Sequence, residues 1–101
     1  AFSLEEAVRQ LTSKPAAIYR IPDRGRIAPG APADLMLFDP ARVAPSLRPR
    51  RVADLPGGDS RMVRDPIGMH GVWVNGVQVH DGRDHVQSGA GPGRVLRHFS
   101  A

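Results

Sequence analysis

The side chains best suited to chemistry in this 101-residue sequence are its four histidines: His70, His80, His85 and His98. None forms a His-x-His pair, and none lies three or four residues from another, the spacings that bring two metal ligands to one face of an element. His80 and His85, flanked by Asp81 and Asp84, come nearest to a metal-binding set. A polar turn after a strand explains these four residues better, so the sequence predicts no metal ligand here.

Other catalytic patterns are also absent from the sequence. There is no Gly-x-Ser-x-Gly and no Ser-x-x-Lys, the arrangements that activate a serine nucleophile. The glycines of residues 89–93 surround Pro92, which has no N–H to offer a phosphate. The sequence contains no cysteine, which excludes disulfides and cysteine-ligated metals. We therefore predict no catalytic, cofactor-binding or metal-binding residue within this chain.

The basic residues suggest a different function class. The formal net charge is +4, and every basic residue except Lys14 is arginine. Arg48, Arg50 and Arg51, with Arg61, form the patch that could bind nucleic acid. No aromatic residue accompanies them to stack on bases, so a solvated loop is favoured and no nucleic-acid partner is expected. No apolar run approaches the ~20 residues that span a bilayer, so no membrane partner is expected either.

Two short helices are predicted at the start of the chain. Ser3 and Glu6 have the spacing of a capping box, in which each side chain accepts a backbone N–H of the first turn. An apolar stripe at helical spacing follows: Leu4, Ala7, Val8 and Leu11. Pro15 suits the first turn of a second helix ending near Tyr19. The single apolar face of this pair needs something to dock against.

The middle of the chain is predicted to hold strands and a long loop. Residues 26–27 are expected to form a short strand, followed by a type II turn at Pro29-Gly30. Residues 35–38 are all apolar, so their strand is expected to be central or covered on both faces. Residues 41–66 show little periodicity and are interpreted as an irregular surface excursion, with one short edge strand near Val52 or Val63.

A hairpin over residues 69–80 is the sharpest local signal. Asn75-Gly76 lies between alternating valines, which favours a type I′ turn because both residues tolerate positive φ. The register that follows pairs Val74 with Val77, Trp73 with Gln78, Val72 with Val79, and His70 with Asp81. Val95-Leu96 is expected to form a short strand or a docked tail. The predicted class is mainly β with one or two N-terminal helices, as the 11 glycines and 10 prolines also suggest.

The order of these motifs resembles the C-terminal part of metal-dependent amidohydrolases. Residues 3–8 and 11–16 resemble the last barrel helix and the turn after it. Residues 23–30 and 33–40 resemble the first returning strands of the family's small β-sandwich, and residues 72–77 resemble its closing hairpin.

Residues 92–97, Pro-Gly-Arg-Val-Leu-Arg, narrow the resemblance to the N-acyl-D-amino-acid deacylase (D-aminoacylase) branch. Gly71 departs from the family pattern, since an aliphatic residue usually stands there.

The resemblance implies a division of the chain and a role for it. Residues 1–20 would be the terminal barrel-type helix and a short second helix, and residues 21–101 a portion of the β-sandwich. The (β/α)₈ barrel, the zinc ions and the catalytic residues of such enzymes would all lie in a longer parent. This chain would then be the structural C-terminal domain of an enzyme hydrolysing amide bonds, and inactive alone.

The resemblance also implies partners. The chain is expected to lean on the barrel and on N-terminal strands of the parent, and its open sheet edge invites a homo-oligomer. A free-standing interaction module is the remaining alternative. A cytoplasmic location is expected.

Overall fold

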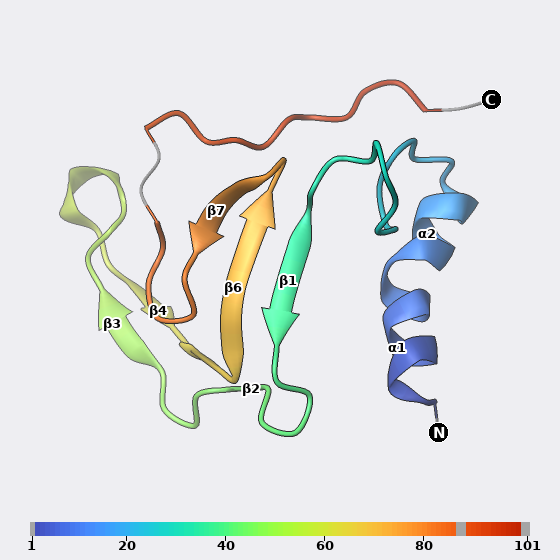
Figure 1. Cartoon of the computed structure of the whole chain (residues 1–101). Helices are drawn as coiled ribbons and strands as arrows, with labels where there is room; N and C mark the ends of the chain where they lie inside the picture. Colours follow the sequence, from blue (N-terminus) through green and yellow to red (C-terminus); the bar gives the residue numbers. More distant parts are fainter. Residues whose placement is uncertain (1, 87–88, 100–101) are drawn as a thin grey trace.

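The computed structural model describes residues 2–86 and 89–99 and consists of two helices followed by short strands (Figure 1). The helices are α1 (Leu4–Leu11) and α2 (Ser13–Ile18). The remaining elements, in chain order, are β1 (Leu35–Phe38), β2 (Ala44–Pro45), β3 (Arg50–Val52), the 3₁₀ turn η1 (Pro56–Gly58), β4 (Arg61–Val63), β5 (Pro66–Ile67), β6 (Met69–Val74) and β7 (Val77–His80). The predicted class, mainly β with N-terminal helices, is confirmed.

Helix α1 begins at the predicted cap. The Ser3 Oγ accepts the backbone N–H of Glu6 at 3.1 Å. The Glu6 carboxylate does not complete the capping box. It accepts two hydrogen bonds from Arg9, at 2.9 and 2.8 Å, and one from Gln10. Only one half of the predicted capping box therefore forms, because a guanidinium one turn away offers a charged, bidentate partner.

The main sheet is antiparallel with strand order β1-β6-β7. The β6–β7 turn has φ values of +49° at Asn75 and +81° at Gly76, as a type I′ turn requires. The predicted pairs next to this turn, Val74 with Val77 and Trp73 with Gln78, are confirmed.

The predicted register fails beyond Trp73. A shift between Val72 and Trp73 places His80 opposite Val72, so the predicted pairing of Val72 with Val79 is wrong. A β-bulge adds one residue to one strand, and turn geometry alone does not reveal it. The predicted pair of His70 with Asp81 does not form either, because the Asp81 carboxylate accepts the N–H groups of Arg83 and Asp84.

Gly71, the departure from the family pattern, has a clear structural reason. It is buried in β6, and a Cβ added there would lie 2.5 Å from the Trp73 ring. The indole therefore occupies the space that a side chain at position 71 would need. The glycine is a packing requirement of the tryptophan two residues later, on the same face of the strand.

Strand β1 lies at the edge of the sheet, and this corrects the prediction that it is central or covered on both faces. Its one hydrogen-bonded neighbour is β6, and Met36 and Leu37 are 57% and 56% exposed. The described residues supply neither a second neighbouring strand nor a layer over its apolar side chains.

The excursion of residues 41–66 is more ordered than predicted. Strands β2 and β5 pair with each other, and β3 pairs with β4, both antiparallel. Together they form an arm that projects from the main sheet, with η1 near its tip (Figure 1). The predicted strand at residues 26–27 does not form. Residues 26–27 instead come after a segment that turns tightly, with positive φ at Arg20, Asp23 and Gly25.

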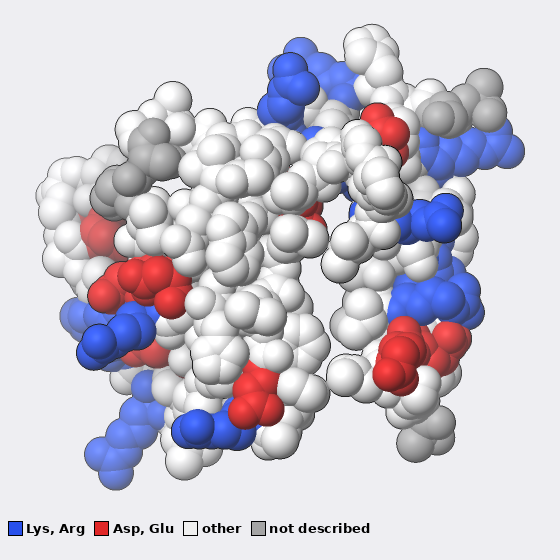
Figure 2. Space-filling model, in the orientation of Figure 1, with Lys and Arg blue, Asp and Glu red and all other residues white. Residues whose placement is uncertain are grey.

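The fold has almost no core of its own. Ala16 is the one hydrophobic residue buried in the part of the chain that the structure describes. The accessible surface is 8174 Å², whereas a compact monomer of 10.9 kDa exposes about 5,600 Å². The radius of gyration is 16.0 Å, against about 13 Å for a compact domain of this length. An opening separates the helical side from the main sheet in Figure 2. The chain thus leaves extensive apolar surface uncovered.

Candidate functional site

The histidines considered first for metal binding meet as a structural pair. His80 and His85 form an isolated β-bridge, and their rings contact edge to face with centroids 5.2 Å apart. The Nδ1 of His80 accepts the N–H of Gly82 at 3.0 Å, which occupies one of its two ring nitrogens.

The neighbouring Asp81 serves the same turn. The backbone N–H groups of Asp84 and Arg83 lower the pKa of the Asp81 carboxyl, because hydrogen bonds to the charged form favour it.

Within residues 2–86 and 89–99 no three His, Asp or Glu side chains converge on a position that could hold a metal ion. The residues present therefore do not fit a zinc site. Ligands for such an ion would have to come from another part of a longer protein.

The arginines considered for nucleic-acid binding lie on the arm and are mostly engaged with it. Arg50 forms a bidentate pair with Asp65, at 2.8 and 3.0 Å, and Arg61 forms another with Asp54, at 2.8 and 2.7 Å. These guanidinium groups lower the pKa of both carboxyls.

The other two arginines of that patch give nucleic-acid binding little support. Arg51 donates to the Ser60 hydroxyl, and Arg48 is exposed in the bend before β3. Carboxylates paired with Arg50 and Arg61 lie within the patch, and their negative charge weakens its attraction for phosphate.

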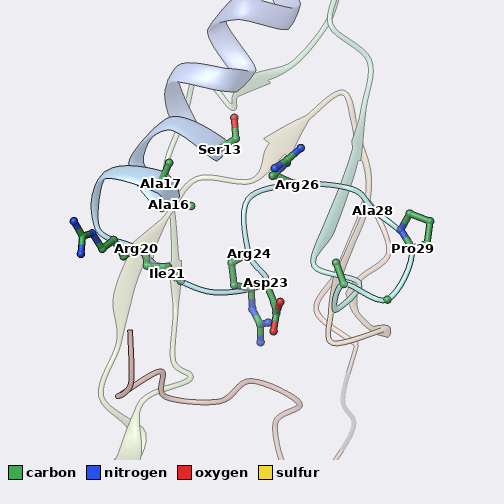
Figure 3. Close-up of a pocket in the computed structure, with 12 residues that line it drawn as sticks. Ser13, Ala16, Ala17, Arg20, Ile21, Asp23, Arg24, Arg26, Ala28 and Pro29 are labelled. Atoms are coloured by element: carbon green, nitrogen blue, oxygen red, sulfur yellow. The ribbon is translucent and has the colours of Figure 1, made fainter. Parts of the chain in front are cut away.

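A hollow of about 750 Å³ lies where α2 meets the turning segment after it. Figure 3 shows Ser13 and Ala16 on the helical side, and Arg24 and Arg26 on the segment after it. Its charged lining residues are Arg20, Asp23, Arg24 and Arg26. No histidine lies beside Ser13 to activate its hydroxyl. The side chains that line this open hollow therefore include no activated nucleophile.

A set of linked polar side chains from distant parts of the chain surrounds the β6–β7 turn. The Nε of Arg24 lies 2.7 Å from the Asp34 carboxylate, and the Arg24 side chain is only 19% exposed. A second nitrogen of Arg24 donates to the Asn75 Oδ1 at 3.2 Å, and the Asn75 N–H donates to Asp34 at 2.8 Å. The Asn75 Nδ2 donates to the Pro92 carbonyl at 2.8 Å. We call Arg24, Asp34 and Asn75 the turn cluster.

Sequence reasoning assigned Asn75 to the turn and missed this cluster. The three residues are far apart in the chain, and no spacing rule relates them. The turn itself was the one signal in the sequence that could have indicated the cluster. An asparagine in such a turn adopts positive φ, and its side-chain amide stays free to bind another segment. The cluster joins four segments and holds no group that could act as a nucleophile.

None of the helices in the described part of the chain has both the length and the apolar character needed to cross a membrane.

Comparison with known proteins extends these observations. The sequence model described as "Amidohydrolase family" matches residues 1–80. An N-acyl-D-aspartate deacylase of Alcaligenes xylosoxydans xylosoxydans is 40% identical over 99 residues, which cover 93% of this chain and 16% of that protein. The D-aminoacylase of the same organism is 34% identical over 104 residues, covering 99% of this chain and 18% of that protein.

An N-acyl-D-glutamate deacylase, again from that organism, is 36% identical over 95 residues, covering 94% of this chain and 17% of that protein. The chain therefore spans about 16–18% of the length of these curated relatives. No solved structure gives a significant match.

Proposed function

The chain belongs to the amidohydrolase family, and from this premise we propose that it is the C-terminal structural domain of a zinc-dependent enzyme that hydrolyses N-acyl-D-amino acids. The observation that carries the proposal is the similarity to three deacylases across at least 93% of this chain. Two of these relatives are named for N-acyl-D-aspartate and N-acyl-D-glutamate, and the third is named as a D-aminoacylase. We therefore assign the parent protein to hydrolysis of the amide bond of N-acyl-D-amino acids.

The structure supports a bracing role for this chain within the parent. The described residues contain no metal-ligand group and almost no core. The surface in excess of a compact monomer is about 2,600 Å², which is what a tightly packed, permanent interface covers on one side. We propose that the barrel and N-terminal strands of the parent cover this surface and supply the zinc ligands.

Self-association is a second part of the proposal. Both β1 and β7 lie at sheet edges, and exposed apolar edge strands pair readily with another chain. Where the barrel does not cover β1, we expect a second copy to do so. A homo-oligomer through this edge is therefore proposed for the 101-residue chain.

Nucleic-acid binding is the alternative from another class, and the arm gives it little support. Of the four arginines considered for this binding, Arg50 and Arg61 already carry bidentate carboxylate partners. Binding that weakens steeply with salt would favour this alternative over the hydrolase.

The proposal is tested on the full-length polypeptide in which this sequence occurs. Release of amino acid is measured from N-acetyl-D-aspartate, N-acetyl-D-glutamate and N-acetyl-D-methionine, with each L enantiomer as control. We expect turnover of at least one D substrate, loss of it after chelation, and recovery with zinc. No turnover of any D substrate by zinc-loaded protein contradicts the proposed hydrolysis.

The 101-residue chain alone serves as the second arm. It should turn over none of these substrates and should bind no zinc in stoichiometric amount. Turnover by this chain would contradict its purely structural role.

A further inference from the structure

The C-terminal segment, residues 89–99, has no helix or strand. It runs along the end of the sheet where the β6–β7 turn lies and continues toward the side of the helices (Figure 1). Among the described residues, one hydrogen bond joins it to the rest of the chain, from the Asn75 Nδ2 to the Pro92 carbonyl. The segment is therefore attached at its root and extends away from that point.

The root is held firmly because Asn75 is itself held on two sides. Its backbone N–H binds Asp34 and its Oδ1 accepts from Arg24. The Arg24–Asp34 ion pair closes the turn cluster at 2.7 Å. A half-buried ion pair of this kind loses less of its attraction to solvent and salt than an exposed one. The position of Pro92 is thus fixed by residues from three other segments.

Beyond the root, the segment presents apolar and basic side chains with nothing over them. Val95 is 77% exposed and Phe99 is 50% exposed. Arg94 comes directly before Val95, Arg97 lies between Val95 and Phe99, and no aspartate or glutamate follows Asp84 in the sequence. An exposed segment that alternates apolar and cationic residues matches a surface with apolar hollows beside carboxylates.

We propose that residues 94–99 are a docking segment for an acidic, apolar-lined surface on the barrel part of the same protein. This inference rests on the proposed function, which supplies the barrel. The turn cluster fixes where the segment starts, so that fewer conformations are lost when it docks. Charge complementarity favours this occupant over the same segment of a second copy, because both segments carry the same positive charge.

The first test is hydrogen exchange on the full-length polypeptide, with a synthetic peptide of residues 89–99 as the undocked reference. Docked amides at positions 95–99 should exchange at least about tenfold more slowly than in the peptide. Raising NaCl to about 1 M should reduce this protection, because charges are then screened within roughly 3 Å. Exchange as fast as in the peptide overturns the proposal.

The second test changes the charge of the segment. Arg94→Glu with Arg97→Glu should abolish the protection, whereas Arg94→Lys with Arg97→Lys should keep most of it. The matched control, Arg48→Glu with Arg83→Glu, makes the same change of net charge elsewhere and should leave the protection intact. Equal effects of the two Glu pairs would show a general effect of net charge and would overturn specific docking.

The third test addresses the root. Asn75→Asp keeps a residue that tolerates positive φ and an oxygen for Arg24, but it removes the donor to Pro92. We expect faster exchange across residues 93–96, with the β6–β7 amides unchanged. Unchanged exchange of the segment overturns the assignment of Asn75 as its anchor.

Hydrolysis is measured on the same samples so that the two proposals can fail separately. Protection in a protein that hydrolyses no D substrate contradicts the proposed hydrolysis and leaves docking standing. Hydrolysis without protection contradicts docking alone. Protection that rises with protein concentration, or that appears only with added nucleic acid, assigns the segment to another partner and overturns the proposal.

Discussion

The helical region and the turn cluster are stabilised in opposite ways. In α1 and α2 every side-chain hydrogen bond joins residues three or four positions apart, from Ser3–Glu6 to Gln10–Lys14. Around the β6–β7 turn the bonds join residues 51, 41 and 17 positions apart. The first set forms within one segment, whereas the second requires the chain to have folded back on itself.

This difference determines how each region is stabilised. Local bonds on exposed helices contribute a few tenths of a kcal/mol each, and α1 has no buried residue. Isolated helices shorter than about 12 residues are marginal in water. The helical region is therefore stabilised mainly by local bonds, whereas the sheet region is joined by contacts between distant segments. Both regions leave apolar side chains exposed.

The largest effect is expected in the sheet, from Gly71→Val. The new side chain would meet the Trp73 ring, which lies 2.5 Å from the position of the added Cβ. Overpacking of this kind costs about 3 kcal/mol, measured as the change in free energy of unfolding by urea. The emission of Trp73, the single tryptophan, should shift to the red as the ring leaves its place. A substitution at exposed Met36 to Val serves as control, and an equal loss in both would refute the packing role of Gly71.

A smaller effect is expected from breaking the turn cluster with Arg24→Met. The change removes the guanidinium from Asp34 and Asn75, and hydrogen bonds to charged groups contribute about 2 kcal/mol. The exposed pair of Arg61 with Asp54 offers a comparison, because Arg61→Met breaks an ion pair of similar geometry on the arm. Urea unfolding should show the larger loss for Arg24. A loss that is as large for Arg61 would mean that burial does not set the value of these pairs.

The helix cap should contribute less than the cluster. Ser3→Ala removes the acceptor for the Glu6 N–H, and loss of an N-cap costs about 1 kcal/mol. Ser3→Asp keeps an acceptor at the same place and should restore stability. Thermal unfolding of the three proteins, followed by circular dichroism at 222 nm, measures this. If Ser3→Asp is as unstable as Ser3→Ala, the cap does not act through its side chain.

The smallest effect is a pH dependence in α1. The hydrogen bond from Arg9 lowers the pKa of Glu6 from 4.5 to about 2. A carboxyl with a lowered folded-state pKa contributes stability above its unfolded pKa and loses it as the pH falls through the folded value. Glu6→Gln should therefore lower the melting temperature slightly at pH 7, and this difference should shrink as the pH falls toward 2. A difference as large at pH 2 as at pH 7 would exclude the charged pair as its source.

The contrast between the two regions also explains which predictions held. The Ser3 cap, the turn at Pro29-Gly30 and the turn at Asn75-Gly76 are confirmed, because each depends on residues within four positions of one another. The type II turn has its Ala31 N–H bonded to the Ala28 carbonyl at 3.1 Å. Local sequence determines such features directly.

The predictions that failed all needed information from outside their own segment. The strand of residues 35–38 was identified by its composition, but its place at the edge depends on which strands are present to pair with it. The order in the arm depends on pairing between separate strands, β2 with β5 and β3 with β4. At Val95-Leu96 the expected strand does not form, whereas the alternative, a docked tail, stays a prediction.

The sequence by itself determined the helix cap, the turns at Pro29-Gly30 and Asn75-Gly76, the strands of residues 35–38 and 69–80, and the resemblance that identified the family. Each of these depends on residue type and short spacing, which set local backbone preference. Only the tertiary structure decided the register shift between Val72 and Trp73, the place of Trp73 over Gly71 and the meeting of Arg24, Asp34 and Asn75. Those features depend on distances between segments far apart in the chain, and such distances exist only after the sheet has formed.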